Sequence, residues 1–433
     1  MRLSIVGGGG FRVPLVYREL VRRPDHGVTE LVLHDSSAGR LQVIRRLTPP
    51  TGALRVRTTT DLTEAITGAD VVFSAIRVGG AAGRVADERR ALRHGLIGQE
   101  TVGAGGLCYG LRTLPVALAL AEGLADRAPG AWLINFTNPA GLVTEASRQV
   151  LGERVIGICD SPAALIGHAS RAVGGAEPVI ADYAGINHLG WLRALWQGGV
   201  DRLPELLADP VRLAGFEEGR LFGPALLRSL AAIPNEYLYF YYHRDEVLAQ
   251  LRAGPTRGEV VAAEQEAFFA AAAAEPERTE QLWQQTRLRR EQSYLAEARD
   301  FERDPLDLAG GGYERIALAL LHGLTGGQVE PLVLNVANGA TFAQLPPDLV
   351  VETRCQVTAQ GAAALPAQPF SLHQLGLISS VRAAERGLIE ATRSGRKEPA
   401  VAALTAHPLI GDERLARAVI TDLLTETPGL ALR

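Results

Sequence analysis

Short apolar stretches, rich in valine, isoleucine and leucine, recur between residues 2 and 158 of the chain. They predict strands over residues 2–6, 30–34, 71–75, 132–136 and 155–158. Runs of this composition are typical of strands that are buried on both faces of a sheet. The stretches between them have helical periodicity, as at 13–22 and 111–125. Strands that alternate with helices predict a doubly wound parallel sheet of the Rossmann type.

The pattern changes after about residue 183, where helical periodicity becomes dominant. Helices are predicted within 221–302, and the charges of the segment 278–303 are interpreted as a solvated helix face. Two strands, predicted at 332–336 and 350–357, interrupt the helical pattern. It returns near the C-terminus in helices predicted at 370–392 and 413–424. We therefore predict an α/β protein with a Rossmann-type domain over residues 1–185 and an α+β domain over residues 186–433.

The composition excludes several classes of function. With 433 residues and 47% hydrophobic composition, the chain can bury a large core in two or three domains. A net charge of -4 provides no basic stripe for a nucleic acid. We find no secretory leader and no apolar run approaching the roughly 18 residues of a membrane span, so we expect a cytoplasmic protein without a membrane partner. Three cysteines in so long a chain predict no disulfide framework.

A glycine-rich turn, Gly7-Gly8-Gly9-Gly10, follows the first predicted strand and precedes a helix. Backbone N–H groups and the positive end of a helix bind a pyrophosphate there without a lysine, and Lys397 is the only lysine in the chain. All four glycines are therefore predicted to bind the cofactor. Asp35 ends the second strand, where a carboxylate accepts hydrogen bonds from ribose hydroxyls and favours NAD over NADP. Arg12 stands at the position of the third glycine of the usual fingerprint. A tight turn without a ligand is the alternative.

Polar residues also follow the strands at 132–136 and 155–158. Asn138 binds either the nicotinamide or substrate hydroxyls, or it belongs to an ordinary Asn-Pro turn at a helix start. Cys159 and His188 supply a thiolate and an imidazole, which form a first pair of ligands for a divalent ion with open positions. The alternative for both is that of packed core residues.

Arginines and tyrosines provide the remaining candidates. Arg77 and Arg84 lie in a glycine-containing stretch, where they either bind a substrate phosphate in a bidentate manner or lie on a helix surface. The tyrosine cluster at 237–242 is either a packing face or the source of a base, because a nearby metal or arginine lowers the pKa of a tyrosine.

Taken together, these segments resemble glycoside hydrolase family 4, the NAD- and metal-dependent glycosidases, and within it the 6-phospho-β-glucosidase-like branch. The resemblance spans most of the chain in the family's order. The matching segments are Val6–Gly10, Gly98-Gln99-Glu100-Thr101, Phe136-Thr137-Asn138-Pro139-Ala140-Gly141, Cys159-Asp160-Ser161-Pro162, Asn187-His188-Leu189, Tyr237-Leu238-x-x-Tyr241 and Asn335-Val336-Ala337-Asn338-Gly339.

The resemblance implies roles for particular residues. Cys159 and His188 are expected to bind a divalent ion, usually manganese. Tyr237 is expected to be the catalytic base, with Tyr239 and Tyr241 as alternatives. Arg84 and Asn138 match substrate-contacting positions of the family, and the predicted substrate-binding set also includes Arg77, Asp160 and Arg257.

The implied reaction is a hydrolysis in which NAD takes a hydride from C3 of the sugar and returns it after C2 deprotonation, elimination of the C1–O bond and addition of water. The expected substrate is a phosphorylated disaccharide or aryl glycoside. Asp160 stands where phospho-β-glucosidases of the family usually have asparagine and phospho-α-glucosidases aspartate, so it is also a candidate general acid for an α-linkage.

The resemblance further implies a second domain of the lactate/malate dehydrogenase type that binds substrate and metal and forms subunit contacts in a homodimer or homotetramer. Three alternatives remain open at this stage. They are a 6-phospho-α-glucosidase or an unphosphorylated-glycoside hydrolase of the same family, a lactate/malate-type NAD-dependent dehydrogenase, and a catalytically silent sugar-phosphate sensor.

Overall fold

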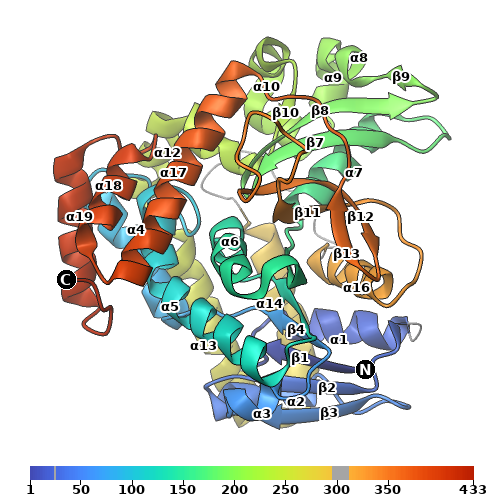
Figure 1. Ribbon diagram of the computed structural model, residues 1–433, viewed down its shortest axis with the longest axis vertical. Coiled ribbons are helices and arrows are strands. Elements are labelled where there is room, and N and C mark those ends of the chain that lie inside the picture. Colours follow the sequence, from blue (N-terminus) through green and yellow to red (C-terminus); the bar gives the residue numbers. More distant parts are fainter. Residues whose placement is uncertain (24–25, 295–311) are drawn as a thin grey trace.

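The computed structural model of the protein describes residues 1–23, 26–294 and 312–433. Its first half is a parallel sheet in the order β3-β2-β1-β4-β5-β6 (Figure 1). The strands are β1 (Arg2–Val6), β2 (Glu30–His34), β3 (Arg55–Thr59), β4 (Val71–Ser74), β5 (Trp132–Asn135) and β6 (Val155–Gly157). Every neighbouring pair within this set is parallel. This is the strand order of a dinucleotide-binding Rossmann sheet, so the predicted fold of the first half is confirmed.

Helices connect these strands, and several begin at residues that cap them. Ser37 accepts a hydrogen bond from the N–H of Arg40, and Asp61 accepts from Thr63 and Glu64. A proline in the first turn of α1 and of α7 suits a position where no N–H is needed. The helices of this half are α1 (Val13–Arg22), α2 (Ala38–Arg46), α3 (Leu62–Ile66), α4 (Gly80–Arg93), α5 (Gly103–Arg127), α6 (Ala140–Leu151) and α7 (Ser161–Val173).

The second half adds antiparallel strands to the same sheet. β11 joins β6 through the pair Asn335 and Gly157, and β12, β7, β8 and β10 follow in that order. The strands are β7 (Ile180–Ile186), β8 (Leu189–Gln197), β9 (Val200–Asp201), β10 (Ile233–Pro234), β11 (Leu332–Ala337), β12 (Val350–Thr358) and β13 (Gly361–Ala364). The predicted α+β character of the second half is confirmed. Residue 185 lies inside β7, and the domain boundary placed there stays a prediction.

The helices of the second half surround this extension of the sheet and also return to the first half. Trp283 and Tyr313 belong to the same hydrophobic core as Leu3 and Leu31 of β1 and β2. The helices are α8 (Leu203–Ala208), α9 (Pro210–Leu213), α10 (Glu217–Leu230), α11 (Tyr239–Tyr242), α12 (Arg244–Ala253), α13 (Arg257–Ala274), α14 (Thr279–Gln292), α16 (Tyr313–Leu324), α17 (Leu372–Ser394), α18 (Lys397–Ala406) and α19 (Glu413–Glu426). Residues 295–302 of the predicted helical stretch lie outside the described residues.

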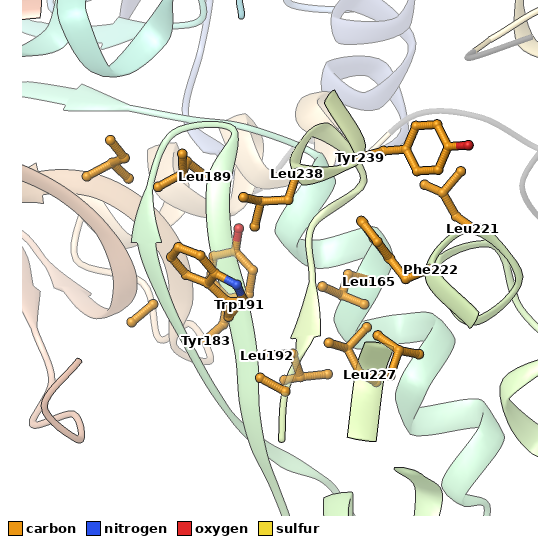
Figure 2. Close-up of a cluster of buried hydrophobic side chains, with 14 of the residues drawn as sticks. Leu165, Tyr183, Leu189, Trp191, Leu192, Leu221, Phe222, Leu227, Leu238 and Tyr239 are labelled. Carbon is orange, nitrogen blue, oxygen red and sulfur yellow. The ribbon is translucent and has the colours of Figure 1, made fainter. Parts of the chain in front are cut away.

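A large apolar core lies beneath the β7–β8 hairpin (Figure 2). Trp191 and Leu192 of β8, Tyr183 of β7 and Leu165 of α7 are fully buried in it. Leu238 is buried in the same core, and it anchors the segment that carries the tyrosine cluster. The core therefore positions two candidate site segments, the hairpin turn and residues 236–238, relative to each other.

One helix has the length and apolarity of a membrane span. Within the described part of the chain, only α5 passes this test, and 72% of its most apolar 18-residue window is buried inside the protein. It packs against α4, α6 and α17. Burial in the core accounts for its composition.

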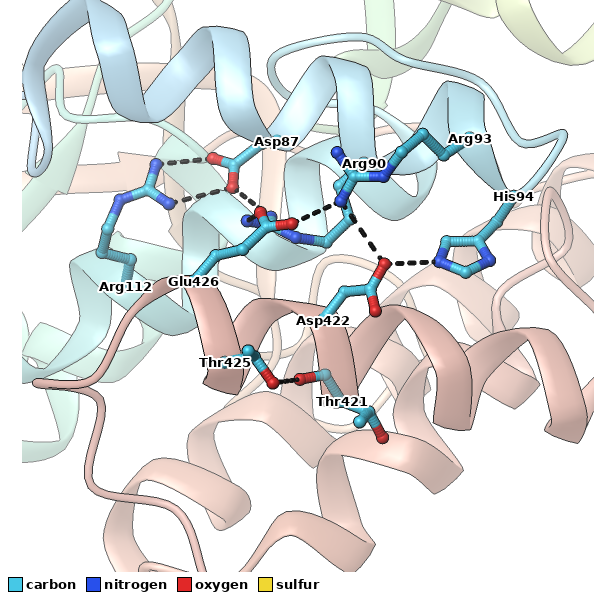
Figure 3. A network of polar contacts seen from close by, with 9 residues as sticks. All are labelled: Asp87, Arg90, Arg93, His94, Arg112, Thr421, Asp422, Thr425 and Glu426. Carbon is cyan, nitrogen blue, oxygen red and sulfur yellow. Dashed lines mark hydrogen bonds and ion pairs between the residues drawn. The ribbon is translucent and has the colours of Figure 1, made fainter.

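A network of ion pairs attaches the C-terminal helix α19 to α4 and α5 (Figure 3). Arg90 is 1% exposed, and it donates to Asp87 at 2.8 Å and to Glu426 at 2.5 Å. Arg112 of α5 donates to the second oxygen of Asp87 at 2.5 Å. His94, the residue after α4, lies 2.9 Å from Asp422 of α19. These contacts connect segments that are far apart in the sequence.

Candidate active site

The glycine turn Gly7–Gly10 connects β1 to α1 and is held closely by its neighbours. Gly7 has a φ of 96°, and a Cβ there would lie 2.4 Å from the carbonyl oxygen of Ala75. None of the described residues accepts a hydrogen bond from the N–H groups of Phe11 and Arg12, which immediately precede α1. The turn therefore fits a pyrophosphate, which is bound by backbone donors at a helix N-terminus.

Gly8 and Gly10 shape this turn, and their own N–H groups are already bonded within the protein. The Gly8 N–H donates to the His34 carbonyl at 2.6 Å, and the Gly10 N–H donates to the Gly7 carbonyl at 2.9 Å. Gly8 is buried, and a Cβ on it would lie 2.8 Å from the His34 backbone nitrogen. The predicted contact of Gly8 with the cofactor stays a prediction. Because it has no side chain, Gly8 allows the turn to pack against the end of β2.

Asp35 lies beside the same turn, at the end of β2. Its Oδ2 accepts a hydrogen bond from the N–H of Gly9 at 3.1 Å, and its Oδ1 accepts from the N–H of Ser37 at 2.9 Å. A Cβ on Gly9 would lie 2.8 Å from Oδ2, so the carboxylate needs a glycine at this position. Each oxygen keeps a further lone pair, which fits the two hydroxyls of an adenosine ribose.

Cys159 and His188 approach the site from different elements. Cys159 is the second residue after β6, and His188 ends the two-residue turn between β7 and β8 with a φ of 61°. His188 Nδ1 lies 2.8 Å from Thr101 Oγ1, so Nε2 is available for a ligand. Burial lowers the pKa of His188 to about 3, against the opposing effect of Glu100, and the imidazole is neutral at neutral pH. Burial, with a further contribution from Glu352, raises the pKa of the Cys159 thiol.

The chemistry of this pair fits a catalytic metal ion. A neutral imidazole and a thiol that loses its proton on metal binding suit a divalent transition metal. The described residues contain no group of three or more histidine, cysteine or acidic side chains placed to hold a metal. Two protein ligands would leave positions open for substrate oxygens or water, which is a feature of catalytic sites and not of structural ones.

Tyr237 is the tyrosine of the cluster that contacts this pair. Its ring stacks on the His188 ring with the centroids 3.7 Å apart. Tyr239 instead stacks on His243, and the Tyr241 hydroxyl lies 3.5 Å from His407 Nε2. Burial, followed by the charge of Glu236, raises the pKa of Tyr237. This direction is opposite to the one we expected for a base, because burial and Glu236 outweigh the hydrogen bond from Tyr294, which acts to lower the pKa of Tyr237.

A buried carboxyl group next to Tyr237 was not predicted from the sequence. Glu236 Oε1 accepts hydrogen bonds from Ser161 Oγ at 2.6 Å and from the Tyr294 hydroxyl at 3.1 Å. The Tyr294 hydroxyl also lies 3.1 Å from the Tyr237 hydroxyl. Burial, with Glu218 nearby, raises the pKa of Glu236 to about 8. A hydrogen-bonded chain therefore connects Ser161, Glu236, Tyr294 and Tyr237.

A second buried carboxyl group supports the turn that contains His188. Glu352 is fully buried in β12 and accepts hydrogen bonds from Asn187 Nδ2 at 3.2 Å and from Asn335 Nδ2 at 2.9 Å. The Tyr183 hydroxyl donates to its other oxygen at 3.2 Å. A glutamate within the apolar run of residues 350–357 is the one sequence signal that could have identified it.

The two arginines predicted to bind phosphate are paired with acids. Arg77 forms an ion pair with Glu100 Oε1, and Arg84 pairs with Glu100 Oε2 at 2.6 Å and with Glu88 Oε1 at 2.7 Å. Burial alone would raise the pKa of Glu100, but Arg77 and Arg84 hold it at about 2. Glu88 Oε2 also accepts from the Gly258 N–H at 2.8 Å, so this cluster connects α4 to the start of α13.

The remaining predicted residues lie around the ends of β5 and β6. Asp160 forms an ion pair with Arg12 at 3.7 Å, and this contact brings the end of β6 against the glycine turn. Asn138 is partly buried between β5 and α6. Arg257 begins α13, and its guanidinium donates to Ser293 Oγ at 2.6 Å and to the Arg290 carbonyl at 2.9 Å. Arg257 therefore contacts the last turn of α14.

Direct contacts connect some of the predicted residues. Arg12 links the glycine turn to Asp160, and Asp160 follows Cys159 directly in the sequence. Tyr237 stacks on His188, and Cys159 and Glu100 lie near enough to contribute to the raised pKa of Tyr237. The parallel half of the sheet thus supplies the dinucleotide turn and Cys159, and the antiparallel half supplies His188 and Tyr237.

Comparisons with known proteins match the chain over nearly its whole length. The family model described as "Family 4 glycosyl hydrolase" matches residues 2–173, and the one for the "Family 4 glycosyl hydrolase C-terminal domain" matches residues 183–410. A protein of Bacillus subtilis (strain 168) named "Probable 6-phospho-beta-glucosidase" is 29% identical over 444 residues, which are 98% of this chain and 96% of that protein.

Two solved structures are similar over the full chain. A 6-phospho-β-glucosidase from Thermotoga maritima, with manganese, NAD+ and glucose-6-phosphate, has a TM-score of 0.83 at 25% identity and covers 100% of this chain and 99% of its own. A 6-phospho-α-glucosidase from gut microorganisms, in complex with NAD and Mn2+, has a TM-score of 0.82 at 25% identity with the same coverage.

Proposed function

This chain belongs to family 4 of the glycosyl hydrolases, and we propose that it hydrolyses 6-phospho-β-glucosides with NAD and a divalent metal ion, manganese, as cofactors. The observation that carries the proposal is the stacking of Tyr237 on His188, with Cys159 near enough to influence the pKa of Tyr237 and with Asp160, the next residue, paired to Arg12 of the glycine turn segment. A simple dehydrogenase of the lactate or malate type does not need this combination of a thiol, an imidazole and a tyrosine. The names of the similar proteins support a phosphorylated glucoside as substrate.

Each demand of the reaction corresponds to a group in the site. When bound, NAD would accept and return a hydride at C3 of the sugar, and the metal ion would polarise the C3 oxygen. Gly7–Gly10 and Asp35 would hold the dinucleotide. Cys159 and His188 would hold the ion, and Tyr237 would remove the proton from C2.

The other residues position the substrate. Asn138 lies at the end of β5, where the nicotinamide and the sugar hydroxyls of an open α/β sheet site meet. Asp160 follows the proposed metal ligand Cys159, and Arg84 lies beside Glu100, which is close to His188. Arg77 and Arg257 complete the proposed set. Arg77 and Arg84 would bind the substrate while they remain paired with Glu100.

A 6-phospho-α-glucosidase is the second candidate, and Asp160 is the observation that favours it. The residue lies at the carboxyl end of β6, where it could act on the leaving oxygen of an α-linked sugar. The similarity to an α-specific relative equals the similarity to a β-specific one in identity and coverage. The linkage is therefore the part of the proposal that most needs a direct assay.

A panel of four substrates tests the proposal. The protein is incubated with NAD+, Mn2+ and a thiol reductant and offered the p-nitrophenyl α- and β-glucosides with and without a 6-phosphate. The proposal predicts p-nitrophenol release from the 6-phospho-β-glucoside, no net NADH, and loss of release on chelation. Net NADH without cleavage would identify a dehydrogenase, and selective cleavage of the 6-phospho-α-glucoside would establish the second candidate.

The assembly and location of the protein are part of the same proposal. We propose two domains, residues 1–185 and 186–433, a homodimer or homotetramer formed by the second domain, and a cytoplasmic enzyme that acts on a phosphorylated disaccharide or aryl glycoside. Separate family models for the two parts of the chain support the division. Sedimentation velocity of the whole chain would test the subunit contacts: the sedimenting species should have two or four times the mass of one chain.

A further inference from the structure

Glu236 connects two segments that reach the site from different parts of the fold. Its Oε1 accepts a hydrogen bond from Ser161 Oγ at 2.6 Å and another from the Tyr294 hydroxyl at 3.1 Å. Ser161 is the first residue of α7 and lies two residues after Cys159, whereas Tyr294 lies two residues after the end of α14. One carboxyl oxygen therefore joins the segment that carries Cys159 to the end of α14.

The backbone that carries Glu236 is fixed by other contacts. The N–H of Asn235 donates to the Gly190 carbonyl at 2.9 Å, and Asn235 Oδ1 accepts from the Tyr237 N–H at 2.8 Å. Leu238 anchors the same segment in the apolar core. Glu236 itself is 6% exposed, and its Oε2 is buried without a hydrogen-bond partner in the described part of the chain. The carboxyl group is thus not needed to hold the backbone, and its contacts converge on Oε1.

Tyr294 connects Glu236 to Tyr237. The Tyr294 hydroxyl lies 3.1 Å from the Tyr237 hydroxyl as well as 3.1 Å from Glu236 Oε1. A phenol has one hydrogen, so when Tyr294 donates to Glu236, its oxygen accepts from Tyr237. The His188 ring stacks on the face of the Tyr237 ring, and this contact leaves the ring free to slide in its own plane. The contact with Tyr294 restricts that movement at the hydroxyl end.

We propose that Glu236 is a positioning residue for the reaction, because it acts through Tyr294 to hold the hydroxyl of Tyr237 in a fixed place relative to the segment that carries Cys159. The inference rests on the proposed function, in which Tyr237 is the base and Cys159 a metal ligand. A reacting group that is displaced by about 1 Å loses a factor of about 10² in rate, so a hydrogen bond that fixes the base contributes to kcat.

Two variants of the full chain remove this support. Glu236→Leu has a similar size but no acceptor, and Tyr294→Phe keeps the ring but loses the hydroxyl. Each should lower kcat for cleavage of the 6-phospho-glucoside by about tenfold, as for the loss of one hydrogen bond in the transition state. KM and the affinities for NAD+ and Mn2+ should stay unchanged, because neither variant removes a proposed ligand-binding group.

A conservative variant and a matched control accompany them. Burial raises the pKa of Glu236 to about 8, so the carboxyl is mostly uncharged at pH 7. The amide carbonyl of Glu236→Gln then replaces Oε1 as acceptor, and this variant should keep most of the wild-type kcat. Tyr17→Phe is the control, because it also removes a tyrosine hydroxyl, one that donates to the Pro49 carbonyl, and it should have wild-type kcat.

A double-mutant test distinguishes positioning from a general loss of structure. In the Tyr237→Phe background no hydroxyl is left to position, so Glu236→Leu and Tyr294→Phe should not lower the residual cleavage any further. A purely structural role would lower the rate by the same factor in both backgrounds.

The outcomes separate the inference from the proposed function. If the wild type cleaves the substrate, the inference is overturned by wild-type kcat in Tyr294→Phe, by an equal loss in the Tyr237→Phe background, or by a Glu236→Gln enzyme as slow as Glu236→Leu. A wild type that cleaves none of the four p-nitrophenyl glucosides would refute the proposed function, and the inference with it. If Glu236→Leu does not fold, Tyr294→Phe decides, because it removes a single oxygen atom from a partly buried side chain.

Discussion

The two residues of the proposed metal pair are buried, and they differ in how ready they are for an ion: His188 is already neutral, whereas Cys159 is a thiol that must lose its proton on metal binding. The His188 imidazole is neutral because burial lowers its pKa to about 3, and Thr101 leaves its Nε2 available. Tyr237 is a phenol because burial and Glu236 raise its pKa. Tyr237 can therefore act as a base only if its pKa is lowered, and the positive charge of a metal ion bound by Cys159 and His188 would lower it.

Replacing Tyr237 by phenylalanine tests the base directly. Tyr237→Phe keeps the ring that stacks on His188 but removes the hydroxyl, so kcat should fall by about 10²–10⁴-fold while NAD+ and Mn2+ still bind. Tyr239→Phe is the matched control, since Tyr239 stacks on His243 away from the pair. The measurement is steady-state cleavage of the 6-phospho-glucoside, and a Tyr237→Phe enzyme with wild-type kcat would contradict the assignment.

Cys159→Ser and His188→Ala should separate metal binding from cofactor binding. Both variants remove a proposed ligand and leave the glycine turn intact, so Mn2+ affinity and activity should be lost while NAD+ affinity is retained. Electron paramagnetic resonance of free Mn2+ and an NAD+ titration measure the two quantities. Full activity of both variants in the presence of a chelator would show that the metal assignment is wrong.

The buried carboxyl of Glu236 should make stability depend on pH. Its pKa rises from 4.5 to about 8 on folding, so between these values the folded state binds more protons than the unfolded state. Stability contributed by this group is complete below pH 4.5 and is lost as the pH rises toward 8. Glu236→Gln removes the titrating group, so its free energy of unfolding should fall by about 1 kcal/mol less than that of the wild type for each pH unit in that window.

Metal-free protein is the material for this measurement, with unfolding followed by denaturant titration at pH 5, 6, 7 and 8. The wild type should lose free energy of unfolding relative to Glu236→Gln at each step. Parallel curves for the two proteins would mean that Glu236 does not titrate in this range.

At the scale of elements, the C-terminal helix α19 depends on buried ion pairs (Figure 3). Glu426→Ala leaves Arg90, which is 1% exposed, with Asp87 as its remaining partner, and should lower the free energy of unfolding by about 1–3 kcal/mol. Glu413→Ala on the same helix removes an exposed pair with Arg417 and should cost under about 0.5 kcal/mol. Equal losses for the two variants, measured by urea unfolding, would contradict this difference.

Helices and strands could be predicted where the sequence of the element itself shows which of its residues are buried. The strands of residues 2–6 and 30–34 and the helix of residues 13–22 have the predicted bounds, because their patterns alone decide which face is buried. β3 (Arg55–Thr59) was not predicted, since it is an edge strand with exposed charges. The β7–β8 hairpin was also missed, because its strands are buried by helices from distant parts of the chain.

Buried charges in the site could not be predicted from the pattern either. In the sequence, Glu352 is a single acid within a largely apolar segment. Its hydrogen-bond partners Asn187, Asn335 and Tyr183 come from three other parts of the chain. Arg290 belongs to a helix with charges on most of its faces, and only the tertiary contact with Phe11 shows that its guanidinium packs against the glycine turn segment. Residue types identified Cys159, His188 and Tyr237 as candidates, but their meeting depends on the fold.

The hydrogen bonds of the glycine turn could not be predicted from the sequence either. Its position between a strand and a helix was predictable from residues 2–22, but the use of each N–H group was not. The Gly8 N–H is bonded to the His34 carbonyl, and the Gly9 N–H is bonded to Asp35. These partners belong to the next strand of the sheet and to the residue after it, so only the paired strands decide which donors stay available for a ligand.

At the scale of the molecule, one sheet holds the whole site. Among the described residues, thirteen strands form a continuous sheet, and the parallel and antiparallel parts meet where Asn335 of β11 pairs with Gly157 of β6. Cys159 is the second residue after β6, so the junction lies close to this member of the proposed metal pair. The nucleotide-binding half and the half that supplies His188 and Tyr237 therefore form a single framework around the site.

The central claim is that NAD is reduced and reoxidised within each glycosidase turnover while Tyr237 exchanges the proton at C2. Hydrolysis of a 6-phospho-glucoside in D2O, with NAD+ and Mn2+ present, tests it most directly. The account predicts glucose 6-phosphate with deuterium at C2, detected by nuclear magnetic resonance, and no accumulation of NADH. Cleavage that retains hydrogen at C2 would contradict it.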